Sequence, residues 1–321
     1  MKKIKYKLMI IIFLVIIGTM SYNMANYINT EKNKAEEGMH ITILGGSSMK
    51  DKGDTNACGY VLRTKNQKLI IVDGGNPIDA DLVYSYIEKY GNGKVDYWFV
   101  THPHMDHIGA LINLLNSDKE FEIENLCYNV LSLDYYEAHD KRGFEAEKAF
   151  YGILDSKKIK NKIICQKDQV IDIDNVRCDI IRVANPNIET SEGGNESTMV
   201  FKFTATDVNK KMLFLGDIYK LSSEELMQRP ELLKSDGVQM AHHGQNGASK
   251  EVYNAISPEI CFFSTPKWLY DNDNGGGYNS GKWKTTVVRG WVKELGAKTV
   301  RAFEGDQTYN FTRKGIFKVY E

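Results

Sequence analysis

Two kinds of hydrophobic pattern alternate along most of the chain. Continuous apolar runs rich in branched and aromatic residues, such as 95–100 and 212–215, are bounded by polar or glycine residues, which is typical of buried strands. Between them, residues 79–90, 134–148 and 221–233 place apolar side chains at helical spacing. Strands that alternate with helices predict a single α/β domain in which helices cover the sheets, and 321 residues are enough for a sizeable core.

The N-terminal region has a different pattern. Four lysines lie within the first seven residues, and residues 8–20 carry no charge. A basic stretch before an apolar one is typical of a signal peptide or a signal anchor. A run of 13 residues is short for a membrane-spanning helix, which needs about 20, but the uncharged run continues to residue 25. No Ala-x-Ala cleavage pattern or nearby cysteine follows, so the pattern favours an uncleaved anchor at 1–25 over a cleaved signal or a buried helix of the domain.

The position of the lysines predicts the location of the protein. Because basic residues stay on the cytoplasmic side, an anchor at 1–25 would hold the rest of the chain outside the cell membrane, whereas cleavage would secrete it. Residues 26–38 are polar and are expected to form a linker. Residues 39–321 are then expected to form the α/β domain.

The densest chemistry in the chain follows the apolar run 95–100. His102, His104, Asp106 and His107 are four candidate metal ligands within six residues. A strand followed by a turn can direct such side chains to one point at a sheet edge. Imidazole and carboxylate groups suit zinc and manganese, and burying them without a cation would be costly. The spacing therefore predicts a metal site.

Three other predicted strands end in residues of the same kind. One is followed by Asp73 and two glycines, another by a glycine and Asp217, and a third by His242, His243 and a glycine. Together with the histidine-rich segment, these strand ends resemble the motifs of the metallo-β-lactamase superfamily, in the same order. The resemblance covers the chain from about residue 39 to the C-terminus and implies an αββα sandwich behind the N-terminal segment.

The resemblance also implies two divalent metal ions, Zn or Mn, that activate a water molecule for hydrolysis. The first ion would be held by His102 and His104, and the second by Asp106, His107 and His243. Asp217 would bridge the two ions, and Asp73 would support the histidine-rich turn from behind. His242 is the alternative to His243 as the ligand, and would otherwise contact the substrate oxyanion or the leaving group.

One element of the superfamily is missing. Most members carry a further histidine 20 to 25 residues before the bridging aspartate, but residues 193–200 contain none, and Asn195 occupies this region. An Asn-x-Ser strand entry, together with the His-His-Gly segment and a closing helix at 291–298, resembles the ComEC-type subgroup, the C-terminal domain of DNA-uptake channels. This departure implies a weaker first metal site that accepts manganese. Catalytic roles then fall to Asp106, Asp217, His242 and Asn195, the last as a hydrogen-bond donor to a phosphate oxygen or as part of ordinary strand entry.

Charge and cysteine content limit the function classes. Without the six lysines and three acids of residues 1–38, the chain carries 35 basic and 39 acidic residues, a net charge of −4. A strong nucleic-acid binder is expected to be basic, which weakens a nuclease assignment without excluding it, because metals supply local positive charge. The five cysteines form no Cys-x-x-Cys pair and are expected to be mostly core residues, with one or two disulfides as the alternative. None stands at the bridging position, so β-lactam hydrolysis is not expected.

Two segments leave alternatives open. The helical pattern at 134–148 indicates an inserted helix over the site or a plain surface helix, with His139 as a solvated residue or a substitute ligand. Basic and aromatic residues surround a glycine-rich loop at 275–277, and they favour either a grip on a polyanion or cell-wall polymer or a solvated loop. These residues are Lys267, Trp268, Lys282, Trp283, Lys284 and Arg289.

Three functions remain compatible with the sequence. The first is an exported or membrane-tethered metallohydrolase that cleaves a phosphodiester, DNA by resemblance to the uptake domain. The second is an esterase that acts on phosphorylcholine or teichoic acid of a cell-wall polymer. The aromatic loop of the protein would bind choline through cation–π contacts. The third is a non-catalytic member that only binds metal or a partner. No obligate protein partner is expected.

Overall fold

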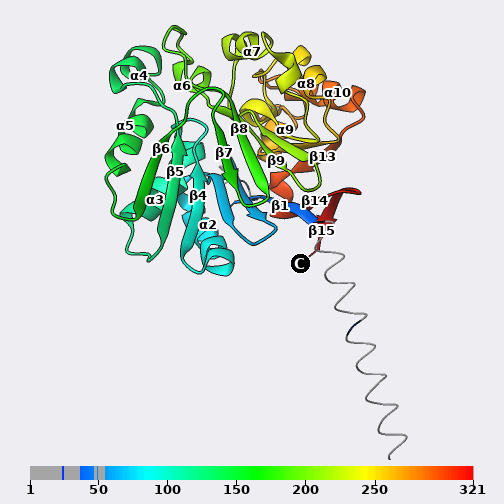
Figure 1. Cartoon of the computed structure of the whole chain (residues 1–321). Coiled ribbons are helices and arrows are strands. Elements are labelled where there is room, and N and C mark those ends of the chain that lie inside the picture. Colours follow the sequence, from blue (N-terminus) through cyan, green and yellow to red (C-terminus); the bar gives the residue numbers. More distant parts are fainter. Residues whose placement is uncertain (1–23, 25–36, 47–48, 50–54, 321) are drawn as a thin grey trace, which may run out of the picture.

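The computed structural model describes residues 24, 37–46, 49 and 55–320, which form two β-sheets with helices around them (Figure 1). The first sheet has the order β15 (Gly315–Val319), β14 (Gln307–Thr312), β1 (Glu37–Ile43), β2 (Gly59–Thr64), β3 (Leu69–Asp73), β4 (Lys94–Phe99), β5 (Glu122–Tyr128), β6 (Ile159–Ile164). The second has the order β13 (Lys298–Arg301), β12 (Ile260–Phe263), β11 (Gly237–Gln239), β10 (Lys210–Phe214), β9 (Val200–Ala205), β8 (Val176–Arg182), β7 (Val170–Ile173).

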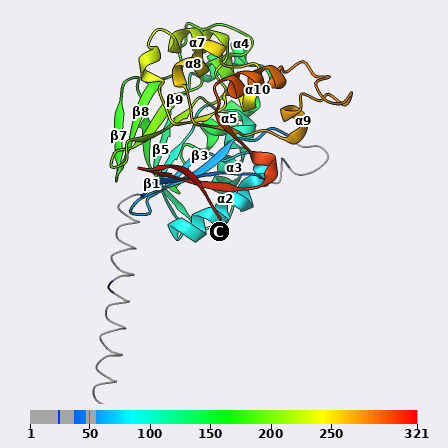
Figure 2. The same cartoon turned by 90° about the vertical axis from the view of Figure 1, so that its right-hand side faces the viewer.

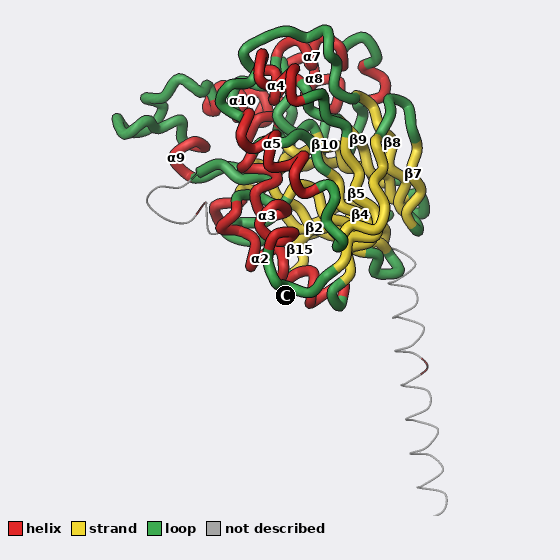
Figure 3. Tube along the Cα trace, turned by 90° about the vertical axis from the view of Figure 1, so that its left-hand side faces the viewer, coloured by secondary structure: helices red, strands yellow, loops and turns green. Residues whose placement is uncertain are grey.

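Side chains that alternate along the strands separate the layers. Ile70 and Val72 of β3 join a core between the two sheets, with partners from the second sheet such as Phe201. Leu69 and Ile71, on the opposite face of β3, pack under helices α2 (Ala80–Tyr86), α3 (Met105–Asn116) and α5 (Phe144–Ile153), which cover that face in Figure 3. The second sheet buries its other face under α7 (Lys220–Leu226), α8 (Lys250–Ile256) and α10 (Thr285–Glu294). The αββα sandwich expected from the sequence is confirmed.

The predicted helices are present but divided. The 79–90 pattern is a short 3₁₀ turn, η2 (Pro77–Asp79), then α2 and a π-turn, η3 (Ile87–Gly91). The 134–148 pattern is two helices, α4 (Leu133–His139) and α5, joined by a turn, and the 221–233 pattern is α7 followed by η4 (Pro230–Leu232). A proline lacks the N–H that an α-helix needs, which explains why the last pattern does not continue as one helix. The closing helix, α10, begins and ends earlier than expected at 291–298.

Each sheet has an antiparallel half and a parallel half. Strands β3 to β6 run parallel in the first sheet, and strands β10 to β13 run parallel in the second. Parallel neighbours bring their carboxyl ends to one edge of a sheet, where ligands bind in α/β proteins. The segments after β3, β4, β10 and β11 carry the predicted site residues, so this topology gathers four distant stretches of chain.

The predicted anchor at 1–25 and linker at 26–38 lie outside the described residues, apart from Met24 and the start of β1 at Glu37. In the part of the chain that the structure describes, no helix has the length and apolar character needed to cross a membrane. All five cysteines are buried and free, so the alternative of disulfides is not supported. The segment between α9 (Lys267–Tyr270) and α10 projects from the body in Figures 2 and 3.

Candidate metal centre

The histidine-rich turn is fixed by Asp73, the last residue of β3. The backbone N–H of Thr101 donates to Asp73 Oδ1 at 2.8 Å, and the Thr101 hydroxyl donates to Asp73 Oδ2 at 2.8 Å. His107, in the first turn of α3, places Nδ1 2.7 Å from the same Oδ2. Asp73 is fully buried. The structure thus places Asp73 directly behind the turn, where a carboxylate holds a ligating imidazole in one orientation.

Hydrogen bonds fix which ring nitrogen of His243, His107 and His102 is left to bind a metal. His243 Nδ1 lies 2.7 Å from the carbonyl oxygen of Ser264, which only accepts, so Nδ1 carries the hydrogen and the Nε2 of a neutral ring has a lone pair. His107 is oriented in the same way by Asp73. The Thr101 hydroxyl gives its hydrogen to Asp73 and therefore accepts from His102 Nδ1 at 3.1 Å. Three Nε2 atoms are left to face the site.

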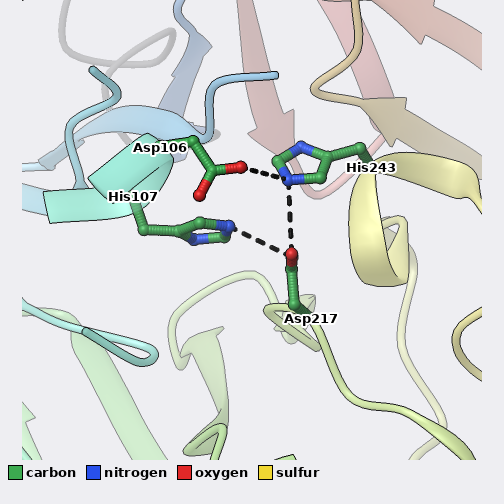
Figure 4. Close-up of side chains that lie close together, drawn as sticks. All are labelled: Asp106, His107, Asp217 and His243. Atoms are coloured by element: carbon green, nitrogen blue, oxygen red, sulfur yellow. Dashed lines mark ion pairs between the residues drawn. The ribbon is translucent and has the colours of Figure 1, made fainter. Parts of the chain in front are cut away.

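Four of the predicted ligands converge on one point (Figure 4). The ligand atoms of Asp106, His107, Asp217 and His243 all lie within 4.8 Å of one another. His107 Nε2 is 3.1 Å from Asp217 Oδ1, and His243 Nε2 is 3.1 Å from Asp106 Oδ2 and 3.2 Å from Asp217 Oδ2. The first sheet supplies two of these residues through α3, and the second supplies the other two. We call these four residues the main ligand group.

The polar atoms of this group fit a divalent cation. Although the distances are short, the Nε2 atoms of His107 and His243 and Oδ1 of Asp217 have no hydrogen-bond partner with proper geometry among the described residues. Buried polar atoms without partners are rare. Burial alone would raise the pKa of Asp217, but His243 and His107 outweigh it and hold the pKa well below 3.8. Burial would lower the pKa of His243, but Asp217 and Asp106 outweigh it and raise that pKa to about 10. A metal ion bound here would supply the positive charge that the protonated ring carries without it.

His102 and His104 do not join the main ligand group. His102 Nε2 is buried, has no hydrogen-bond partner among the described residues and lies 4.0 Å from Asp217 Oδ2. Burial, followed by the neighbouring histidines, lowers the pKa of His102 well below 6.5, so its ring is neutral. His104, at the N-cap of α3, instead directs Nε2 to Asp140 Oδ2 at 2.5 Å. The assignment of His102 and His104 to one ion therefore stays a prediction.

Asn195 lies in a one-turn helix, α6 (Gly193–Glu196), and not at a strand entry, because β9 begins only at Val200. Asn195 Nδ2 donates to Glu192 at 3.3 Å, and its buried Oδ1 has no partner in the described structure. Ser197 is used locally, since its hydroxyl donates to the carbonyl oxygen of Gly194 at 2.7 Å. Asn195 lines the cleft, whereas Ser197 does not.

His242 and His243 lie in the 3₁₀ turn η5 (Ala241–Gly244), and both have left-handed backbone angles, with φ of 49° and 57°. This conformation directs the two neighbouring rings differently. His243 enters the main ligand group, whereas His242 lines the cleft and contacts the ring of Tyr219 at 5.4 Å. Burial lowers the pKa of His242 to about 4. His242 is therefore neutral at physiological pH and able to donate one hydrogen bond and accept another.

The cleft above these residues has a volume of about 510 Å³. Its walls include Arg142 from the α4–α5 turn, and Lys282 and Trp283 from the segment before α10. Trp283 packs edge-on against Trp268, with ring centroids 5.0 Å apart. Part of the predicted basic and aromatic loop thus borders the site, while Lys267 forms an ion pair with Asp271.

Two acidic residues near the site were missed from the sequence. His139, which the sequence offered as a substitute ligand, packs its ring at a tilt against Tyr135 with centroids 4.8 Å apart, whereas the next residue, Asp140, contacts His104. Glu147 lies beside Asp140, and burial followed by Asp140 raises the pKa of Glu147 to about 9. The sequence signal for them was two acids seven residues apart, Asp140 and Glu147, in the 134–148 segment that was expected to lie over the site.

Comparison with known proteins agrees with this architecture. A model of the metallo-β-lactamase superfamily matches residues 55–119, which include Asp73 and the histidine-rich turn. A search of curated protein sequences finds no match. Together with the αββα layers and the order of the site segments, the match shows a metallo-β-lactamase fold and supports membership of that superfamily.

One solved structure of low sequence identity shares the fold, and two others are similar to this chain with TM-scores below 0.5. The β-hydroxylase CmlA (E377D mutant) has 11% identity and a TM-score of 0.53 over 85% of this chain and 54% of its own. The metallo-β-lactamase fold protein YhfI of Bacillus subtilis has 13% identity and a TM-score of 0.47 over 82% and 95%. Yeast PDE1 has 11% identity and a TM-score of 0.49 over 85% and 99%. At such identities the likeness concerns the fold alone.

Proposed function

We propose that the protein is a metal-dependent hydrolase that holds two divalent ions, Zn²⁺ or Mn²⁺, and cleaves phosphodiester bonds. The observation that carries the proposal is the main ligand group, whose atoms lie within 4.8 Å of one another beside a cleft. When bound, two such ions activate a water molecule and clamp the attacking and leaving oxygens of a displacement at phosphorus. The intact group argues against a degenerate, non-catalytic member.

The residues around the cleft suit an anionic substrate. Lys282 brings positive charge to its wall, where Arg142 is paired with Glu192, and neutral His242 is placed to hydrogen-bond a substrate or leaving-group oxygen. Asn195 lines the same cleft. These groups bind and orient a phosphodiester, while Asp106 and Asp217 hold the metal ions.

We further propose that the chain is a protein of the ComEC-type subgroup and that DNA is its substrate. The absence of the usual histidine near Asn195 and the His-His-Gly segment support this subgroup. The sequence pattern of residues 1–25 supports an anchor in the cell membrane, with the domain outside. Protease added to intact cells should then digest the domain, and protection from protease would contradict this location.

The function is tested with the full chain, purified in detergent, by its metal content and its hydrolysis of bis-p-nitrophenyl phosphate. The wild type is expected to contain metal and to hydrolyse the diester. His243→Ala should lower turnover by more than the roughly 10- to 100-fold that loss of an outer partner costs. His139→Ala, which removes a histidine outside the ligand groups, is the matched control. Metal-loaded wild type without turnover would overturn the proposal.

A cell-wall phosphorylcholine or teichoic acid esterase is the second candidate, favoured by Trp283 in the cleft wall. A tryptophan face attracts a quaternary ammonium group through cation–π contacts. This candidate predicts that p-nitrophenyl phosphorylcholine is preferred to bis-p-nitrophenyl phosphate, and that Trp283→Ala removes the preference. Cleavage of DNA with no preference for the choline ester would favour the nuclease.

A further inference from the structure

A second group of candidate ligands borders the cleft through His104 and Asp140. The ligand atoms of His104, Asp140 and Glu147 lie within 4.8 Å of one another. They come from the N-cap of α3, the residue after α4, and the first turn of α5. We call these three residues the side group.

The carboxylates of the side group are buried and have few hydrogen-bond partners in the described part of the chain. Glu147 has no exposed surface, and neither of its carboxylate oxygens has a hydrogen-bond partner in the described part of the chain. Asp140 is only 2% exposed, and a single backbone N–H, that of Gly143, donates to its Oδ1 at 3.1 Å. Arg142, two residues after Asp140, pairs with Glu192 instead. Two buried carboxylates in contact with an imidazole are held together by positive charge between them, supplied either by a proton or by a cation.

The loop that lacks the usual histidine meets the side group through its backbone. A Cβ atom added at Gly194 would lie 1.9 Å from Asp140 Oδ2 and 2.2 Å from His104 Nε2. No side chain fits there, so Gly194 leaves its space to the Asp140 carboxylate. Asn195, the next residue, lines the cleft and has a buried Oδ1 without a partner in the described structure, but an amide oxygen is a weaker ligand than histidine. The inserted segment from α4 to α5 therefore supplies the donors that this loop does not.

We propose that Asp140 and Glu147, with His104, hold the first of the two divalent ions in place of the missing histidine. Two carboxylates and one imidazole form an oxygen-rich ligand set, which suits Mn²⁺ better than Zn²⁺. The main ligand group holds the other ion. This inference rests on the proposed binuclear hydrolase and adds the ligands and metal preference of one of its two positions.

The test counts metal ions in the full chain after equilibration with Mn²⁺ or Zn²⁺, and measures Mn²⁺ affinity from the electron paramagnetic resonance signal of the free ion. The wild type should bind two ions and Asp140→Asn only one. Glu147→Gln should weaken Mn²⁺ binding at this position by roughly 10-fold or more. Glu145→Gln, an exposed acid in the same turn of α5, is the matched control and should bind as the wild type.

A further variant covers the event that Asp140→Asn fails to fold. Asp140→His keeps a ligand at this position, so two ions should remain and the preference should shift from Mn²⁺ toward Zn²⁺. Two ions in Asp140→Asn, or unchanged Mn²⁺ affinity in Glu147→Gln and unchanged preference in Asp140→His, would overturn the inference and indicate a purely structural, proton-sharing cluster.

The metal count separates this inference from the proposed function. A protein that binds two ions in the expected pattern but hydrolyses no phosphodiester would overturn the function and keep the side group as a metal site. A protein that hydrolyses the diester with an unchanged count in Asp140→Asn would overturn the side group and keep the function. His243→Ala should lose the ion of the main ligand group and retain Mn²⁺ at the side group.

Discussion

At the scale of single residues, Asp73 determines how well the site is organised. Its carboxylate accepts hydrogen bonds from Thr101 and contacts His107 Nδ1 at 2.7 Å. Asp73→Asn replaces one acceptor oxygen by a donor NH₂ group, so the His107 ring loses its fixed orientation. We expect metal affinity to fall by about 10- to 100-fold, measured by competition with a chelator. Glu145→Gln serves as the control, and unchanged affinity in Asp73→Asn would contradict this role.

The sequence indicated which residues gather near the strand ends, but it did not indicate the contact that His104 makes with the turn after α4. Asp106, His107, Asp217 and His243 follow buried strands, and parallel strands carry such residues to one edge. His104 lies in the same motif, yet its ring faces Asp140, which depends on how α4 and α5 fold back. No spacing rule encodes that contact. The pairing between His104 and an inserted segment is a tertiary contact, which local sequence patterns do not predict.

At the scale of elements, the turn between β7 and β8 fastens the second sheet to the first. Asp174 accepts hydrogen bonds from the Thr64 hydroxyl at 2.7 Å and from the backbone and side chain of Asn66 at 2.9 and 2.7 Å. Partial burial would raise the pKa of Asp174, but the bonds from Thr64 and Asn66 outweigh it and lower the pKa below 3.8. The ionised carboxylate therefore stabilises the folded protein.

This depressed pKa sets the pH dependence. The contribution of Asp174 is complete above the unfolded-state pKa and disappears as the pH falls through the lower folded-state pKa. We expect Asp174→Asn, whose side chain tolerates the positive φ of 56°, to lower the free energy of unfolding by at most about 1 kcal/mol at pH 7. The difference should shrink below pH 4 in urea unfolding of metal-free protein. A difference that stays constant to pH 3 would exclude the carboxylate as its cause.

Strand and helix patterns predicted the elements, but not where helices divide. The apolar spacing at 134–148 is continuous, yet α4 ends at His139 and α5 begins at Phe144. Gly143 N–H donates to Asp140 and Glu147 is buried beside it, so polar contacts that cross the turn interrupt the helix. Hydrophobic periodicity reports which face is buried and does not report such contacts.

At the scale of the whole molecule, the site joins the two halves of the sandwich. Asp106 and His107 belong to the half built on the first sheet, and Asp217 and His243 to the half built on the second. The core between the sheets holds the halves together without metal. An ion in the main ligand group would add a link between strand ends that are far apart in the sequence, so metal binding and global stability should be coupled.

We therefore expect divalent metal to raise the melting temperature. A ligand at 100 times its Kd stabilises the folded state by about 2.7 kcal/mol, which corresponds to a shift of roughly 5 °C or more for a domain of this size. The measurement is thermal unfolding of the full chain with EDTA, Mn²⁺ or Zn²⁺. His243→Ala should lose most of the shift, while His139→Ala should keep it, because only the first substitution breaks the ligand group that spans both halves. An equal shift in both variants would mean that the metal stabilises the protein from another position.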